Sequence, residues 1–230
     1  MALYVLSLGG SIVVPGAIDT DYLTEFKQFI DRRIDQGDRF ILTVGGGRTA
    51  RNYQAAAEQV SGVDDEERDW LGIHATRLNA HLLRTIFKGK AHPLIAKDFD
   101  KPLPEFTEPI LVGAGWKPGW RTDYIAVLLA ERYQARSVLN LSNIDYVYAE
   151  DPRENPAAQR YEQISWTEFR QIVGDKWSPG LSAPFDPIAS KRAASQELSV
   201  VILNGKKIAN MEAFLRGEAF AGTTIRSQHV

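Results

Sequence analysis

The sequence predicts an α/β fold in which a mainly parallel sheet is covered by helices. Three observations lead to this prediction. Short apolar runs alternate with stretches of helical periodicity, glycine clusters directly follow two of those runs, and 44% of the 230 residues are hydrophobic, which suffices for a sizeable core. This length fits one large α/β domain, and no linker or internal repeat divides the sequence.

The first half of the chain begins with an apolar run at residues 4–8, which predicts a buried strand. Asp19–Asp21 then offers helix cap residues, and apolar residues recur at helical spacing until Gly37, which ends the helix. The acidic segment 64–69 leads into another helix, whose apolar face ends at Ile86. The other elements predicted in this half are strands at 40–44, 91–96 and 109–113 and helices at 49–60 and 122–132.

The second half shows the same alternation, with clear start signals for two helices. Ser165–Glu168 matches a capping box, in which the serine and the glutamate each satisfy a free backbone N–H. Asp186 precedes Pro187, which places a cap residue before a proline at the first helical position. The other elements predicted here are strands at 137–141, 199–203 and 223–225 and a helix at 210–216 that Gly217 closes.

Charge and cysteine content exclude several classes of function. The net charge is −2 and the pI about 6.1, so no basic surface for nucleic acid is expected. No run approaches the roughly 18 apolar residues of a membrane span, and the first residues lack the basic region of a signal peptide. The absence of cysteine rules out disulfides and thiolate metal sites. We therefore expect a soluble cytoplasmic protein without membrane or nucleic-acid partners.

Two glycine clusters stand at the carboxyl ends of predicted strands. Gly9–Ser11 follows the first strand, and Gly45–Arg48 follows the strand at 40–44. Without a Cβ atom the backbone can approach an anion closely, and its N–H groups can point at phosphate oxygens. Neither cluster is a complete nucleotide signature, so each by itself is also compatible with a plain tight turn. Together, and with Arg51 downstream, they predict a site that holds two phosphate groups.

Three further segments are expected near the same edge of the sheet, because ligands of parallel sheets gather at the carboxyl ends of strands. The loop Gly113–Asp123 carries phosphate donors and two tryptophans that could stack on a base or pack on the protein body. Ser142–Pro152 offers Asn, Asp and Tyr side chains after a strand, or forms a capped turn. Asp186–Lys191 places a lysine one turn into a helix with a positive amino end, where it either binds an anion or is solvated.

The order of these motifs resembles the amino-acid-kinase superfamily. The motifs are G-G-S, G-G-G-x-x-x-R, D-x-x-G, P-G-x-x-T-D, N-x-D-x-V-Y-x-x-D-P and D-P-x-x-x-K, and within the superfamily they are most similar to uridylate kinases of the archaeal type. The resemblance implies a three-layer α/β/α sandwich, with an acceptor-binding half at about 1–135 and an ATP-binding half at about 136–230. It also implies phosphoryl transfer from ATP to UMP with magnesium, and a homohexamer.

The resemblance assigns residues to the two substrates. Residues that match the ATP site of the family are Gly10, Ser11, Gly47, Arg51, Ser142, Asn143, Tyr148 and Asp151. Residues that match the UMP site are Gly46, Asp69, Trp116, Lys117, Pro118, Gly119, Trp120, Arg121 and Thr122. No cluster of metal-ligating side chains is assigned.

The expected reaction suggests a role for each catalytic candidate. A UMP phosphate has its second pKa at about 6, so it is largely ionised at neutral pH and the reaction needs no general base. The obstacle is repulsion between two anions, which positioning and cationic donors overcome. We therefore assign Lys191 to the transferred phosphoryl group and Gly9, with the turn after it, to cradling phosphates. Asp145 or Asp186 would orient Lys191 or magnesium, and Asp69 would accept a ribose hydroxyl.

The chain departs from the family pattern at three places. Ser7 stands where many members have a lysine that reaches the phosphates, although archaeal-type relatives also lack it. Tyr146 replaces the glycine of N-x-D-G-V-Y, so either the backbone there does not need a positive φ or the loop is reshaped. The archaeal acceptor loop is close to T-H-P-G-H-T-T-D, and its small or imidazole side chains are replaced here by Trp116, Lys117, Trp120 and Arg121. The bulky rings could stack on uracil or fill its pocket.

Two alternatives remain open on the sequence. One is a kinase of another small phosphorylated acceptor, such as an isoprenoid phosphate. Relatives of that kind carry a histidine just after the glycine turn, and residues 48–53 contain none. The other is a non-catalytic nucleotide-binding relative, which the changes at Ser7, Tyr146 and the acceptor loop would permit. The charged residues of the family pattern are retained, which favours an enzyme; they are Arg51, Asp145, Asp186 and Lys191.

Overall fold

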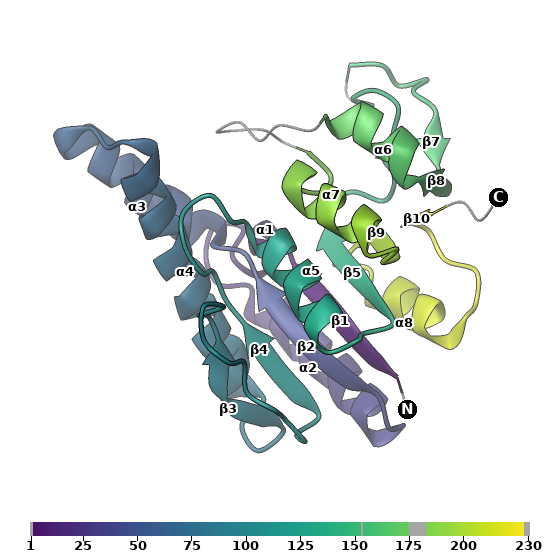
Figure 1. Cartoon of the computed structure of the whole chain (residues 1–230), viewed down its shortest axis with the longest axis horizontal. Coiled ribbons are helices and arrows are strands. Elements are labelled where there is room, and N and C mark those ends of the chain that lie inside the picture. The colour runs from purple at the N-terminus through teal and green to yellow at the C-terminus, as the bar shows by residue number, and fades with distance from the viewer. Residues whose placement is uncertain (1, 153, 175–182, 228–230) are drawn as a thin grey trace.

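An eight-stranded sheet forms the middle layer of the protein, in the strand order β3-β4-β2-β1-β5-β9-β10-β8 (Figure 1). The computed structural model describes residues 2–152, 154–174 and 183–227. The strands of this sheet are β1 (Leu3–Leu8), β2 (Arg39–Val44), β3 (Ala91–Ala96), β4 (Ile110–Gly113), β5 (Ser137–Ser142), β8 (Gln163–Ser165), β9 (Val200–Asn204) and β10 (Thr223–Arg226). A separate two-stranded sheet pairs β6 (Val147–Tyr148) with β7 (Arg160–Tyr161).

The strands from β3 to β9 in this order all run parallel, which brings their carboxyl ends to one edge of the sheet. Leu6 of β1 pairs with Leu42 of β2 on one side and with Leu139 of β5 on the other. The prediction of a mainly parallel sheet is therefore confirmed. The predicted final strand is present as β10, but it runs antiparallel to β9, and β8 pairs with it at the edge of the sheet.

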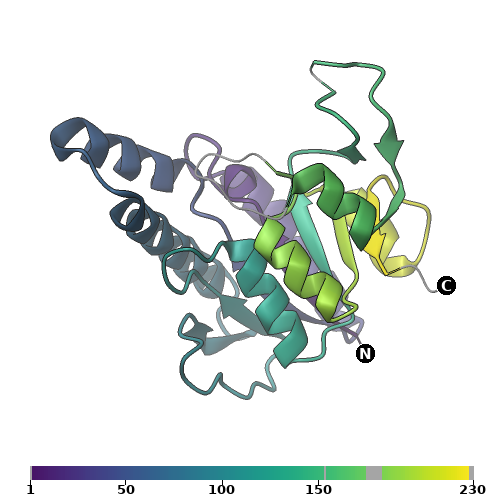
Figure 2. The ribbon, with the colours of Figure 1, turned by 45° about the horizontal axis from the view of Figure 1, so that its top comes forward.

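Helices cover both faces of the sheet and complete a three-layer α/β/α sandwich (Figures 1 and 2). Because side chains alternate along a strand, Leu6 packs in one core with Phe26 and Leu83, whereas Val5 packs in the opposite core with Ile125. The helices are α1 (Gly10–Val13), α2 (Thr20–Asp35), α3 (Gly47–Ser61), α4 (Asp65–Ile86), α5 (Thr122–Arg132), α6 (Trp166–Val173), α7 (Pro187–Ser195) and α8 (Ile208–Arg216).

The predicted helix starts are confirmed by their hydrogen bonds. The Asp19 carboxylate caps α2 by accepting the backbone N–H three residues on, and Asp186 caps α7 in the same way, with Pro187 at the first position. Both hydrogen bonds of the capping box between Ser165 and Glu168 are present at the start of α6. These caps determine where each helix leaves the sheet and so where its first turn lies.

Some short elements have no counterpart in the sequence predictions. They are α1, β6, β7 and β8, each of four residues or fewer. Such lengths are too short to display a helical or strand period, so pattern analysis cannot find them. Two predicted helices begin slightly earlier than expected, with α3 starting at Gly47 and α8 at Ile208. Across the described ranges, no helix has the length and apolar character to cross a membrane.

Candidate functional site

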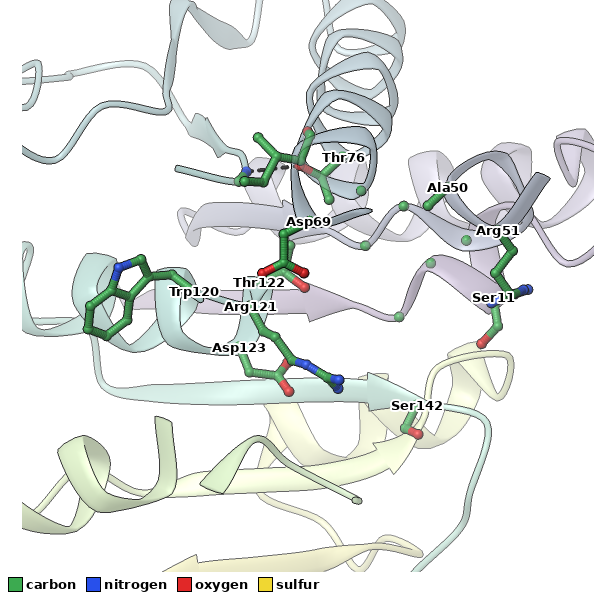
Figure 3. Close-up of a pocket in the computed structure, with 18 of the residues that line it drawn as sticks. Ser11, Ala50, Arg51, Asp69, Thr76, Trp120, Arg121, Thr122, Asp123 and Ser142 are labelled. Carbon is green, nitrogen blue, oxygen red and sulfur yellow. Dashed lines mark hydrogen bonds between the residues drawn. The ribbon is translucent and has the colours of Figure 1, made fainter. Parts of the chain in front are cut away.

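A cavity of about 490 Å³, here called the first cavity, lies at the carboxyl ends of β1, β2, β4 and β5 (Figure 3). In Figure 3, Trp120 lies at one end of the cavity, Ser11, Arg51 and Ser142 lie toward the other, and Arg121 lies between them. The predicted residues that line it are Gly9, Gly10, Ser11, Gly46, Gly47, Arg51, Asp69, Gly119, Trp120, Arg121, Thr122 and Ser142. The lining of this cavity thus includes residues from the first glycine turn as far along the chain as Pro184.

The two glycine turns pack against each other backbone to backbone. A Cβ atom on Gly10 would lie 2.2 Å from the Gly47 nitrogen, and one on Gly47 would lie 2.3 Å from the Gly10 carbonyl oxygen. Gly47 also has a φ of +62°, which disfavours any other residue. Only glycine fits either position, so the turn after β1 and the start of α3 form one continuous backbone surface. The positive amino end of α3 favours an anion there.

Helix α4 holds two loops of the first cavity in place. Asn79 donates to the Gly45 carbonyl oxygen at 2.8 Å, which fastens the triple-glycine turn. Thr76 accepts the Gly115 N–H at 3.0 Å, and Arg77 donates to the Gly115 carbonyl oxygen at 3.0 Å, which fastens the loop after β4. The sequence analysis missed these residues. The available signal is the pair of buried polar side chains, Thr76 and Asn79, on an otherwise apolar helical face.

Asp69 fastens the same loop from the first turns of α4. Its Oδ2 accepts the Gly119 N–H at 2.8 Å, so the D-x-x-G and P-G-x-x-T-D motifs are joined by a hydrogen bond. Gly119 has a φ of +83°, which explains the glycine at this turn. A carboxylate that receives one N–H retains capacity to accept a hydroxyl from a ligand.

The two loop tryptophans lie differently. Trp120 lines the first cavity and packs against Tyr124 with ring centroids 4.2 Å apart. Trp116 lies outside the cavity lining, 6.1 Å from the Trp120 ring and 5.5 Å from the Phe99 ring. The Lys117 ammonium lies 3.9 Å from the centre of the Trp116 ring, also away from the cavity. The aromatic side chains therefore form a row along the loop and leave the cavity open, rather than filling it.

Asp123, the aspartate of the P-G-x-x-T-D motif, lies in the lining of the first cavity, although the motif alone predicts no role for it. Its carboxylate accepts the Ser7 hydroxyl at 3.1 Å and the backbone N–H of Asp186 at 3.3 Å. Burial, together with the negative charge of Asp186, raises the pKa of Asp123 to about 6. Burial also raises the pKa of the Asp186 carboxyl. The sequence feature that could have identified Asp123 is its place in the P-G-x-x-T-D motif, directly after the first residue of α5.

A second cavity, of about 600 Å³, adjoins the first, and Ser142, Ala183 and Pro184 line both. Tyr146 has no positive φ, so the replacement of the family glycine leaves an ordinary backbone conformation there. The Arg160 guanidinium lies 4.8 Å from the centre of the Tyr146 ring. The predicted residues in the lining of this cavity are Ser142, Asn143, Tyr148 and Asp151.

Several predicted residues lie outside both cavities. Lys191 is exposed on α7, because the buried face of that helix includes Ala189 and Ser190 and turns Lys191 outward. The Asp145 carboxylate forms an ion pair with Lys207 at 2.8 Å. Asp186 is buried and caps α7, so its described contacts and those of Asp145 do not include Lys191. The role of Lys191 at the transferred phosphoryl group therefore stays a prediction. The others outside are Trp116, Lys117 and Pro118.

Comparison with known proteins identifies the family of the chain. The profile of the Amino acid kinase family matches residues 2–204. The chain is 33% identical over 223 residues to the uridylate kinase of Pyrococcus abyssi, covering 96% of this chain and 98% of that one. It is 35% identical over 227 residues to the uridylate kinase of Methanospirillum hungatei, covering 98% and 95% of the two chains. The crystal structure of the uridylate kinase from Archaeoglobus fulgidus superposes with a TM-score of 0.80 at 31% identity, covering 98% of this chain and 100% of that one. The chain belongs to the amino acid kinase family.

Proposed function

We propose that this chain is a uridylate kinase, which transfers the γ-phosphoryl group of ATP to UMP and releases UDP and ADP. The observation that carries the proposal is the meeting of the two glycine turns at a cavity that adjoins a second one. Two nucleotides that react through their phosphates need a shared anion site with a nucleoside pocket on each side. Relatives that match nearly the whole chain carry the name uridylate kinase, which supports the choice of acceptor.

In this proposal ATP occupies the second cavity and reaches into the first. Tyr146 and Tyr148 offer rings on which adenine can stack, while Asn143 and Asp151 offer polar groups to the base or ribose. Ser142 lines both cavities, so in this proposal the ATP phosphates extend past it from the second cavity into the first. Beyond it the phosphates would meet Gly10, Ser11, Gly47 and Arg51.

UMP occupies the other end of the first cavity. Asp69 holds the Gly119 N–H and can accept a ribose hydroxyl as well. Trp120 offers a ring face to the uracil. The proposal gives contact roles to Gly46, Asp69, Gly119, Trp120, Arg121 and Thr122, and an indirect role in shaping the loop to Trp116, Lys117 and Pro118.

The proposed reaction moves no proton. An oxygen of the UMP phosphate attacks the γ-phosphorus, and the new P–O bond forms as the bond to the departing ADP oxygen breaks. The protein must therefore align the two phosphates and neutralise their charge. The turn that begins at Gly9 and the amino end of α3 offer backbone N–H donors for this purpose.

Magnesium enters this proposal as the companion of ATP, where it neutralises charge on the β- and γ-phosphates. In the part of the chain that the structure describes, no group of three or more acidic, histidine or cysteine side chains forms a metal-binding cluster. Magnesium keeps several waters and often binds mainly through substrate phosphates.

We also propose that the chain assembles as a homohexamer, an expectation taken from its resemblance to archaeal-type kinases. Light scattering on the purified chain tests this directly. The expected mass is six times that of one chain, and a monomeric or dimeric mass would contradict it.

A coupled ADP-release assay tests the proposed reaction. ATP and magnesium are held constant while UMP, CMP, dUMP, AMP and isopentenyl phosphate are compared as acceptors. We expect the highest kcat/KM with UMP. Highest activity with isopentenyl phosphate would identify an isoprenoid phosphate, rather than UMP, as the acceptor. ATP binding without turnover of any acceptor would favour a non-catalytic nucleotide-binding protein.

A further inference from the structure

The first cavity presents negative charge at the place where two phosphates would meet. Asp123 lines the cavity, and Asp186, which is only 5% exposed, places its backbone N–H against the Asp123 carboxylate. The two carboxylates are close enough for the charge of Asp186 to raise the pKa of Asp123. Two incoming phosphates would add to this charge, so phosphoryl transfer here requires a cationic side chain beside the carboxylates.

Arg51 and Arg121 are the cationic side chains in the described lining of the first cavity. Arg51 lies near Ser11, at the end away from Trp120 (Figure 3). The Arg121 side chain instead extends into the middle of the cavity, toward the space between Asp123 and Ser142 (Figure 3). Its positive charge opposes the burial-driven rise in the pKa of both Asp123 and Asp186, which is consistent with a guanidinium near both carboxylates.

The backbone of Arg121 is held by neighbouring structure. Arg121 is the N-cap residue of α5, with extended backbone angles of −79° and 165°. Two residues later Asp123 is anchored to β1 through Ser7, and two residues earlier Gly119 is anchored to Asp69. The loop is thus fastened on both sides of Arg121, which limits where its guanidinium can reach.

We infer that Arg121 is a catalytic residue that binds the transferring phosphoryl group, an inference that rests on the proposed function. The guanidinium donates N–H bonds to the equatorial oxygens as the bond to ADP breaks and the bond to UMP forms, while no proton is transferred. Asp123 and Asp186 hold the positive charge of Arg121 beside the reaction path. Arg121 lies in the lining of the first cavity, whereas Lys191 is not among the lining residues of either cavity.

Steady-state kinetics of Arg121→Ala, Arg121→Lys and the wild-type chain test this inference. We expect Arg121→Ala to lose at least about 100-fold in kcat, because a cation at the transferring group acts mainly in the transition state. The KM for UMP is expected to change less than about 5-fold. Arg121→Lys keeps the positive charge but lacks the paired N–H donors of a guanidinium. Its kcat should therefore lie between those of the wild-type chain and Arg121→Ala. Added guanidinium should partly restore Arg121→Ala and leave the wild-type chain unaffected.

Arg132→Ala is the matched control, because this arginine lies at the opposite end of α5 and its described contact is the Tyr133 ring, at 6.0 Å. It should keep kcat close to that of the wild-type chain. An Arg121→Ala variant with more than a third of wild-type kcat, or one changed only in KM for UMP, would overturn the inference while leaving the proposed function intact. A wild-type chain that phosphorylates none of the acceptors would overturn both.

Discussion

The acceptor side of the first cavity and the wall of the second cavity are fastened in different ways. Asn79 and Asp69, both on α4, bind backbone atoms of two separate loops on the acceptor side. Tyr146 and Tyr148 line the second cavity, and Thr223 joins the short strands β6 and β7 by accepting from Val147 and donating to the Tyr161 carbonyl oxygen. Helix α4 therefore holds the loops of the acceptor side, whereas Thr223 of β10 holds the two short strands on the donor side.

This difference suggests what each side contributes. Hydrogen bonds between side chains and loop backbone determine positions to within a few tenths of an ångström, which phosphoryl transfer requires. Ring faces bind any planar base and tolerate small displacements. We therefore expect changes on the acceptor side to alter turnover and stability, and changes on the donor side to alter mainly the KM for ATP.

The largest effect is expected at the contact between the glycine turns. Gly10→Ala puts a Cβ atom 2.2 Å from the Gly47 nitrogen, so the turns must separate. We expect turnover to fall by about 100-fold or more, since a displacement of about 1 Å can cost that much, and stability to fall by about 1–3 kcal/mol. Kinetics and urea denaturation measure both. Gly16→Ala, where the added atom meets nothing within 4 Å, should be close to neutral, and equal effects of the two variants would refute a tight contact.

The next effect concerns Asp123, the half-buried acid in the lining of the first cavity. The pKa of Asp123 is raised to about 6, so the folded chain binds a proton more readily than the unfolded chain. The associated stability is present below about pH 4 and is lost as the pH rises through about 6. Relative to Asp123→Asn, the wild-type chain should therefore lose up to about 3 kcal/mol between pH 4 and pH 8. Denaturation of both proteins across this range tests it, and a difference that does not vary with pH would contradict the expected charge burial.

A smaller effect is expected from the hydrogen bond between α4 and the triple-glycine turn. Asn79→Ala removes this partly buried hydrogen bond to the Gly45 carbonyl oxygen, which should cost about 0.5–1.5 kcal/mol. Turnover should fall about 10-fold because the turn loosens. Asn155→Ala removes an exposed hydrogen bond to Glu150 and should change stability by less than about 0.5 kcal/mol. If both variants have wild-type stability, α4 does not hold the acceptor side as described.

The smallest effect is expected on the donor side. Tyr146→Ala removes one ring from the second cavity, and the loss of stacking of about 1 kcal/mol should raise the KM for ATP about 5-fold. The kcat and the KM for UMP should stay within about 2-fold. Tyr53→Ala, at a tyrosine that is 63% exposed on α3, serves as the control. A large fall in kcat for Tyr146→Ala would contradict the proposed difference between the donor side and the acceptor side.

Much of the fold and part of the site could be predicted because their signals are local. Apolar runs predict strands, and the glycine clusters at Gly9 and Gly45 predict where the carboxyl ends of β1 and β2 gather. The placement of Gly46, Asp69 and Trp120 in one cavity agrees with the motifs in which they occur. In each case the pattern lies within a few residues of the element that it describes.

The rest depends on which face of a helix packs inward and on partners far along the chain. The motif D-P-x-x-x-K places Lys191 on α7, but the core beneath α7 determines that this lysine points outward. Asn79 shows its role only once β2 brings the Gly45 carbonyl oxygen alongside it. Strands as short as β6 and β7 exist because of pairing with each other, which no short window of sequence contains.

Helix α4 has a mechanical consequence for the first cavity. Through Asn79 and Thr76 it is hydrogen-bonded to the loop after β2 and to the loop after β4, so one helix positions both loops. If α4 slides or tilts, the two loops move with it and the distance between them is preserved. A disturbance reaching this helix would then shift the whole acceptor pocket relative to the ATP side without changing its width.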